Sequence, residues 1–216
     1  MSIFKRLVAF SFLLMWCAVL LAYRIVRTES SAYTFLAWNL FLATVPLLAA
    51  SVLLTLHRRG GSIAAQAVAF AVWILFLPNA PYILTDFIHL DRSGVMPLWY
   101  DIALLASGAG TGVLFAYASA SYVQAVIAER WGAITGWIVS FVAFLLSGFG
   151  VYLGRFLRWN SWDAVTDPAN VFRDIVPRVI DPLAHIGTLG VTIIYGVGLT
   201  LGYAAVRSIP PPRTPE

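Results

Sequence analysis

Residues 133–153 read AITGWIVSFVAFLLSGFGVYL, a run of 21 residues without a single Asp, Glu, Lys or Arg. A helix needs roughly 20 mostly apolar residues to cross the hydrocarbon core of a bilayer. A helix on the surface of a soluble domain would instead carry a polar face that repeats every three to four residues. The run therefore predicts a membrane-spanning helix, and further runs on both sides of it extend this prediction to the whole chain.

The composition agrees with a protein that lies mostly in lipid. Of its 216 residues, 60% are hydrophobic and 11% are charged, whereas soluble domains carry about 25% charged residues. We predict an all-α fold, a polytopic membrane helix bundle of about six transmembrane helices with two short interfacial amphipathic helices. Residues 1–209 would form a single transmembrane domain, and the proline-rich residues 210–216 a disordered tail. The other five spans are expected at residues 7–23, 33–56, 62–77, 97–123 and 181–206.

The net charge of +4 does not indicate a nucleic-acid partner. The basic residues are scattered at the ends of the apolar runs, where they anchor helices to headgroups and set the topology. No basic stripe with interleaved aromatic residues, as nucleic-acid binding requires, occurs in the sequence. The lipid bilayer is therefore the expected partner. The sequence contains one cysteine, Cys17, which excludes an intramolecular disulfide.

Two connections, about 79–96 and 154–180, are longer than a turn, and together with Asp181 directly after the second they contain six of the ten acidic residues. Six spans place both connections on the same side of the membrane. When the long second connection is left out, the basic residues favour a cytoplasmic N-terminus. The expected location is the inner membrane of a bacterial cell, with both connections outside.

The first connection predicts a short amphipathic helix that begins near Asn79. Its polar face would carry Tyr82, Asp86 and His89, and the last two are three residues apart, close enough to touch. Such a pair can act as an oriented general base or ligate a metal ion, but a polar face that only meets water and headgroups explains the pattern equally well. Asp101, at the start of the fourth span, is a further catalytic candidate, unless it only stabilises the N-terminus of its helix.

The second connection begins with two arginines, Arg155 and Arg158, which share one face if the preceding helix continues. Two guanidinium groups on one face suit a phosphate or a carboxylate, although they can also contact lipid phosphates without specificity. Asn160 and Asp163 add a polar patch, and a second amphipathic helix follows. We therefore expect a shallow polar pocket between the two connections, with Tyr82 and these four residues as binding candidates.

Three stretches of the sequence carry a family resemblance: residues 76–90 (FLPNAPYILTDFIHL), Trp99-Tyr100-Asp101, and residues 154–163 (GRFLRWNSWD). In this order they resemble the motifs of an uncharacterised bacterial integral-membrane family, domain of unknown function 1361, from about the second span to the sixth. The resemblance implies a prokaryotic multi-pass membrane protein of the plasma membrane and no assigned activity.

The sequence leaves three functions open. The first is a subunit whose polar pocket binds a membrane-protein partner or an anionic lipid headgroup. The second is a membrane-embedded enzyme, with or without a metal ion, that acts on a lipid or lipid-linked substrate. The third is a small-solute transporter. The span interiors speak against it, because they contain few of the ionisable residues that ion and proton pathways usually have. No cofactor signature occurs, so cofactor and metal remain unknown, as do the oligomeric state and whether the protein is an enzyme.

Overall fold

The computed structural model describes residues 3–90 and 95–209. The proposed tail, residues 210–216, and Asp91 in the first connection lie outside the described residues. The described chain consists of helices and the turns that connect them, without a strand, which confirms the all-α prediction. In order, its elements are α1 (Ile3–Thr28), α2 (Phe35–Arg58), α3 (Ile63–Phe76), α4 (Asn79–Tyr82), the 3₁₀ helix η1 (Ile83–His89), α5 (Leu98–Trp131), α6 (Ala133–Phe156), α7 (Asp163–Thr166), α8 (Pro168–Ile180) and α9 (Ile186–Ser208).

Six helical segments are long and apolar enough to cross a membrane, as the sequence predicted. Five of them are α1, α2, α5, α6 and α9, and the sixth is the continuous path through α3, α4 and η1, from Ile63 to His89. Many large apolar side chains on these helices are exposed. Exposed apolar surface of this extent is normal where lipid rather than water surrounds the helices.

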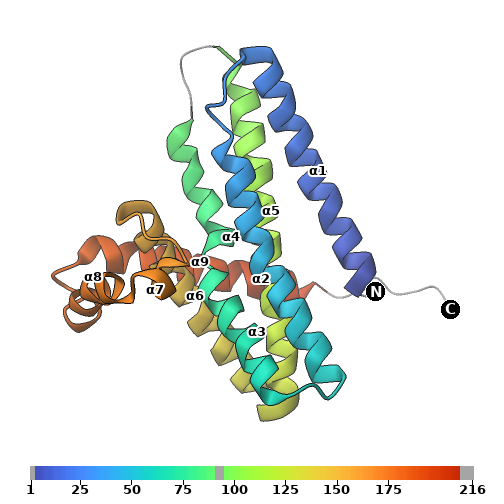
Figure 1. The fold of residues 1–216 in the computed structure, drawn as a ribbon, viewed down its shortest axis with the longest axis vertical. Helices are drawn as coiled ribbons and strands as arrows, with labels where there is room; N and C mark the ends of the chain where they lie inside the picture. The colour runs from blue at the N-terminus through green and yellow to red at the C-terminus, as the bar shows by residue number, and fades with distance from the viewer. Residues whose placement is uncertain (1–2, 91–94, 210–216) are drawn as a thin grey trace.

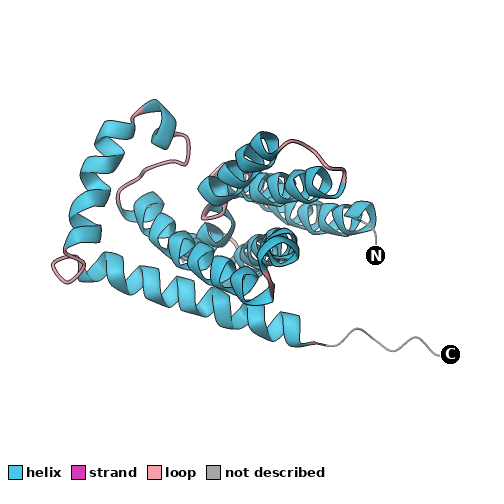
Figure 2. Ribbon diagram, turned by 90° about the horizontal axis from the view of Figure 1, so that it is seen from below, coloured by secondary structure: helices cyan, strands magenta, loops and turns pink. Residues whose placement is uncertain are grey.

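The helices form a bundle that is elongated along α1, α2 and α5 (Figure 1). In both ribbon views α9 runs across the long axis of this bundle and packs against α6, and α7 and α8 form a lobe at one side (Figures 1 and 2). Small residues allow the closest approaches. A Cβ added to Gly148 would lie 2.5 Å from the backbone oxygen of Thr192, and one added to Gly112 would collide with the backbone oxygen of Ala80. Close backbone packing of this kind holds helices together where lipid supplies no hydrophobic drive.

The third span is broken but not ended by its prolines. Pro78 and Pro81 remove backbone donors, and the side chain of Asn79 donates to the carbonyl oxygen of Phe76 at 3.0 Å across the break. The first of the two expected amphipathic helices is therefore the continuation of this span, and the two short helices, α7 and α8, both lie in the second connection. The polar face of the continuation is turned into the bundle, because Asp86, only 1% exposed, finds its hydrogen-bond donors there.

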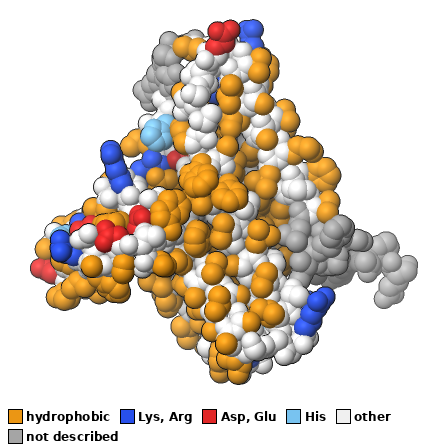
Figure 3. Space-filling view, in the orientation of Figure 1, with side chains coloured by type: hydrophobic (Ala, Val, Ile, Leu, Met, Phe, Trp, Pro, Cys, Tyr) orange, Lys and Arg blue, Asp and Glu red, His pale blue; other side chains and the backbone are white. Residues whose placement is uncertain are grey.

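The space-filling view shows where charge reaches the surface. Basic, acidic and histidine side chains gather on and above the lobe at the left, while most of the remaining face is apolar (Figure 3). The candidate functional site lies where this lobe meets α2, α4 and α6.

Candidate functional site

The buried carboxylate of Asp86, on η1, is at the centre of a cluster of polar side chains from η1, α2 and α6, the Asp86 cluster. The side-chain amide of Asn39 on α2 donates to its Oδ2 at 2.8 Å. The guanidinium of Arg155 on α6 donates to its Oδ1 at 2.5 Å. Three elements that are far apart in the sequence thus meet at one carboxylate, whose charge is compensated by a neighbouring cation.

The guanidinium of Arg155 has further contacts that hold it in place. Its Nε donates to Oγ1 of Thr85 at 2.7 Å, its Nη1 lies 3.0 Å from Nε2 of His89, and it stacks over the ring of Tyr82 with its central carbon 4.5 Å from the ring centroid. A guanidinium only donates hydrogen bonds, so Nε2 of His89 is the acceptor in this contact. The structure therefore brings together four predicted residues, namely Tyr82, Asp86, His89 and Arg155.

This arrangement does not suit the metal site that the sequence left open. The position between the Asp86 carboxylate and His89, where a metal cation would bridge them, is occupied by the Arg155 guanidinium, which is always charged. Across residues 3–90 and 95–209, no group of three or more His, Cys, Asp and Glu side chains is placed to hold a metal ion. The chemistry that the geometry offers is hydrogen bonding and ion pairing.

Asp101 lies apart from this cluster, in a second buried ion pair. Arg24 on α1 donates from Nε to Oδ1 at 2.8 Å and from Nη2 to Oδ2 at 3.1 Å, a two-pronged contact with both side chains at most 2% exposed. The Arg24 guanidinium also covers the ring of Tyr33 at 3.7 Å. The partnership was not predicted, although the sequence contained a signal for it: both residues lie at span ends on the same side of the membrane.

Arg158 does not share a face with Arg155, because α6 ends at Phe156. The backbone of Arg158 has φ +64, in the left-handed region that a residue other than glycine seldom adopts, and this redirects the chain. Its side chain is exposed and has no hydrogen-bond or ion-pair partner in the described part of the chain. The next two predicted residues pair with each other: the backbone and side-chain nitrogens of Asn160 donate to Oδ2 of Asp163 at 2.7 and 3.1 Å.

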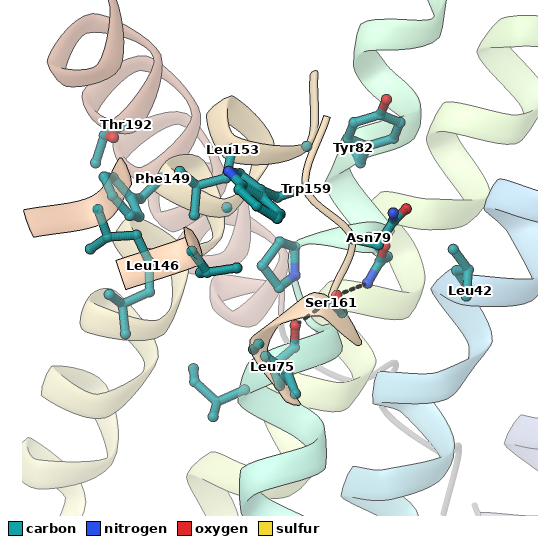
Figure 4. A pocket seen from close by; sticks show the side chains of 18 of the residues that line it. Leu42, Leu75, Asn79, Tyr82, Leu146, Phe149, Leu153, Trp159, Ser161 and Thr192 are labelled. Carbon is teal, nitrogen blue, oxygen red and sulfur yellow. Dashed lines mark hydrogen bonds between the residues drawn. The ribbon is translucent and has the colours of Figure 1, made fainter. Parts of the chain in front are cut away.

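A cavity of about 940 Å³ lies beside the Asp86 cluster, between the bundle and the lobe. Its walls come from α2, α3, α4, α6, α7, α8, α9 and the segment between α6 and α7. Most of the lining is aliphatic or aromatic: Trp38, Leu42, Ala71, Ile74, Leu75, Pro78, Val142, Leu145, Leu146, Phe149, Gly150, Leu153, Gly154, Ala164, Val171, Ile175 and Val179. In Figure 4, Leu146, Phe149 and Leu153 form one wall, opposite Asn79 and Tyr82.

One end of the cavity is polar but carries no ionised group. The polar residues of this end are Asn39, Asn79, Tyr82, Trp159, Asn160 and Ser161, whereas Thr192 lies on the opposite side, beside Phe149 (Figure 4). No Asp, Glu, Lys, Arg or His is among the described residues that line the cavity. Asn79 donates to the Ser161 hydroxyl at 2.8 Å, and this hydroxyl donates to the carbonyl oxygen of Leu75 at 3.0 Å (Figure 4). A long apolar chamber with an uncharged polar end suits an amphiphilic ligand.

Sequence reasoning found parts of this cavity but not the whole. Tyr82 and Asn160, two of the predicted binding residues, line it, and so do Val171, Ile175 and Val179 of the second amphipathic helix. The contributions of α2, α3 and α9 were not predicted. In an apolar span, the residues that face lipid and the residues that line a cavity are of the same types. The sequence therefore contained no signal that separates them.

Comparison with protein families gives one match, over residues 38–201, to the family described as Protein of unknown function (DUF1361). The match runs from α2 to α9, which is the extent expected from the three motifs. Comparison with curated proteins and with solved structures found no match.

Proposed function

Since the chain belongs to the family Protein of unknown function (DUF1361), whose description assigns no activity, we propose a function for this multi-pass membrane protein from its cavity. The protein binds one membrane lipid, with the hydrocarbon chain between α3, α6 and α8 and the headgroup at the polar end. The observation that carries this proposal is the largely apolar cavity of about 940 Å³, whose polar lining groups other than Thr192 lie at one end.

The size of the cavity supports an amphiphile of this kind. Pockets for small ligands have volumes of roughly 300–1,000 Å³ and are mostly apolar with a few placed polar groups. A hydrocarbon chain gains little by moving from the bilayer into a protein, because lipid tails are as apolar as leucine. The apolar walls therefore accommodate the hydrocarbon chain, whereas selectivity among lipids depends on the polar end of the cavity.

The proposal can be tested by filling the cavity. Ala71 lines it on α3, and Ala67, one helical turn earlier, is exposed but does not line it. Ala71→Trp is expected to abolish co-purification of lipid in native mass spectrometry, because the indole occupies the volume that the chain needs. Ala67→Trp, with the same added side chain on the same helix, is expected to retain it. Equal lipid occupancy in the two variants would contradict the proposal.

The other predicted functions have less support from the geometry. Of the catalytic candidates, Asp86 and His89 are both engaged by Arg155, and Asp101 is paired with Arg24 outside the cavity. The expected anionic headgroup required Arg155 and Arg158 to act together, whereas Arg155 is paired with Asp86 and Arg158 is turned away by its backbone. No particular contact favours an enzyme, a transporter or a protein partner over lipid binding.

The topology is part of the proposal: a bacterial cell membrane, a cytoplasmic N-terminus, and the lobe on the outer face. Cysteine labelling checks it, because the native thiol of Cys17 is buried and gives the background. Ala169→Cys in α8 is expected to react with a membrane-impermeant maleimide in intact cells. Trp131→Cys, at the opposite end of α5 from Leu98, is expected to react only after the membrane is permeabilised. The reverse pattern would invert the orientation.

A further inference from the structure

The polar end of the cavity presents hydrogen-bond acceptors, and this feature restricts the headgroup. Three asparagines line it, and each amide has one oxygen that accepts and one nitrogen that donates. The nitrogens are used within the protein. Asn39 donates to the Asp86 carboxylate, Asn160 donates to the Asp163 carboxylate, and Asn79 donates to both the Phe76 carbonyl and the Ser161 hydroxyl.

The orientation of each amide follows from these partners. A carboxylate or a carbonyl oxygen can only accept, so the group that faces it must be the N–H side of the amide. The side-chain oxygens of Asn39, Asn79 and Asn160 are thereby left as acceptors. Within the described chain none of the three receives a hydrogen bond, and the Tyr82 hydroxyl has no hydrogen-bond partner there either. A bound headgroup with hydroxyl groups can donate hydrogen bonds to these oxygens.

The charged groups behind the lining also favour a headgroup that donates hydrogen bonds over an anionic one. Three donors of the lining, the amides of Asn39 and Asn160 and the indole of Trp159, each point to an aspartate: Asp86, Asp163 and Asp174. Arg155 compensates the first of these and Arg178 lies 4.0 Å from the third, but neither guanidinium is among the groups that line the cavity. A fully ionised phosphate at this end would face acceptor oxygens with carboxylates behind them, and it has no hydrogen to donate.

We propose that the lipid held in the cavity has an uncharged headgroup whose hydroxyl groups donate hydrogen bonds to the side-chain oxygens of Asn39, Asn79 and Asn160. A glycosylated diacylglycerol supplies several such hydroxyls, and a diacylglycerol supplies one. The inference rests on the proposed lipid-binding function and names the ligand class for the same cavity. It also replaces the anionic headgroup that the sequence suggested.

The test uses two lipids with the same acyl chains, diacylglycerol and phosphatidic acid, which differ only in a hydroxyl against a phosphate. Each is titrated into the delipidated, detergent-solubilised protein, and occupancy is measured by native mass spectrometry. Diacylglycerol is expected to bind about tenfold more tightly or better, since its hydroxyl can donate a hydrogen bond to an amide oxygen that an ionised phosphate cannot, and one such hydrogen bond changes the affinity on the order of tenfold.

A matched pair of variants locates the effect. Asn160→Ala removes one acceptor from the cavity and is expected to weaken diacylglycerol binding about two- to tenfold. Asn170→Ala is the control, because Asn170 also donates to an aspartate three residues away, Asp167, but does not line the cavity. It is expected to leave the affinity unchanged.

The outcomes separate the two claims. Phosphatidic acid that binds as tightly as diacylglycerol or more tightly, with both lipids excluded by Ala71→Trp, overturns the uncharged headgroup and leaves lipid binding in the cavity intact. Equal effects of Asn160→Ala and Asn170→Ala also overturn the headgroup assignment. Binding of neither lipid, or binding that Ala71→Trp does not change, overturns both proposals.

Discussion

Arg24→Met is expected to lower the free energy of unfolding by about 3–5 kcal/mol, because it leaves the carboxylate of Asp101 buried without its cation. Asp101 is 1% exposed, so water cannot replace the two hydrogen bonds that Arg24 donates to it. The same substitution removes a guanidinium that lies against the Tyr33 ring and links α1 to α5. The measurement is unfolding of the purified protein in mixed micelles with increasing denaturing detergent.

Two controls test whether the loss of stability comes from the broken ion pair. Arg27→Met, at an exposed position one turn further along α1, is expected to change the free energy of unfolding by less than about 0.5 kcal/mol. The double variant Arg24→Met/Asp101→Leu is expected to recover much of the loss, because replacing both partners leaves no buried charge. A double variant no more stable than Arg24→Met alone would show that packing, and not the ion pair, accounts for the effect.

Arg155→Met is expected to cause a loss of similar size, again about 3–5 kcal/mol, for the same reason at Asp86. Arg155→Lys is expected to recover only part of it. A lysine ammonium can compensate the carboxylate, but it lacks the planar set of donors that reaches Asp86, Thr85 and His89 together. Thermal unfolding and denaturing-detergent titration of the two variants measure the difference.

The neighbouring exposed arginine is the matched control for this experiment. Arg158→Met removes the same charge three residues away, where the side chain has no partner in the described chain, and is expected to stay within about 0.5 kcal/mol of the wild type. Equal losses for Arg155→Met and Arg158→Met would contradict a specific role of the Asp86 pair. Normal stability of Arg155→Met would show that Asn39 alone satisfies the buried carboxylate.

Part of the candidate site followed from the sequence because it depends on short spacing. Asp86 and His89 are three residues apart, so they lie close together on any helical path, and Arg155 follows at the end of a span on the same side. Their direct contact did not follow, because the Arg155 guanidinium lies between them. The expected pairing of Arg155 with Arg158 required α6 to continue, and α6 ends at Phe156.

The sequence by itself determined that this protein lies in a membrane, that it has six spans, and where its second long connection lies. Those properties follow from the hydropathy and length of each local segment, and they need no knowledge of the other segments. Only the tertiary structure decided that Asp101 pairs with Arg24, that Asp86 is buried against Asn39 and Arg155, and that the helices enclose a cavity. The physical reason is that these features arise where side chains from distant segments meet. Which side chains meet depends on how the helices pack against one another in pairs. This packing leaves no periodic pattern in the sequence of a largely apolar span.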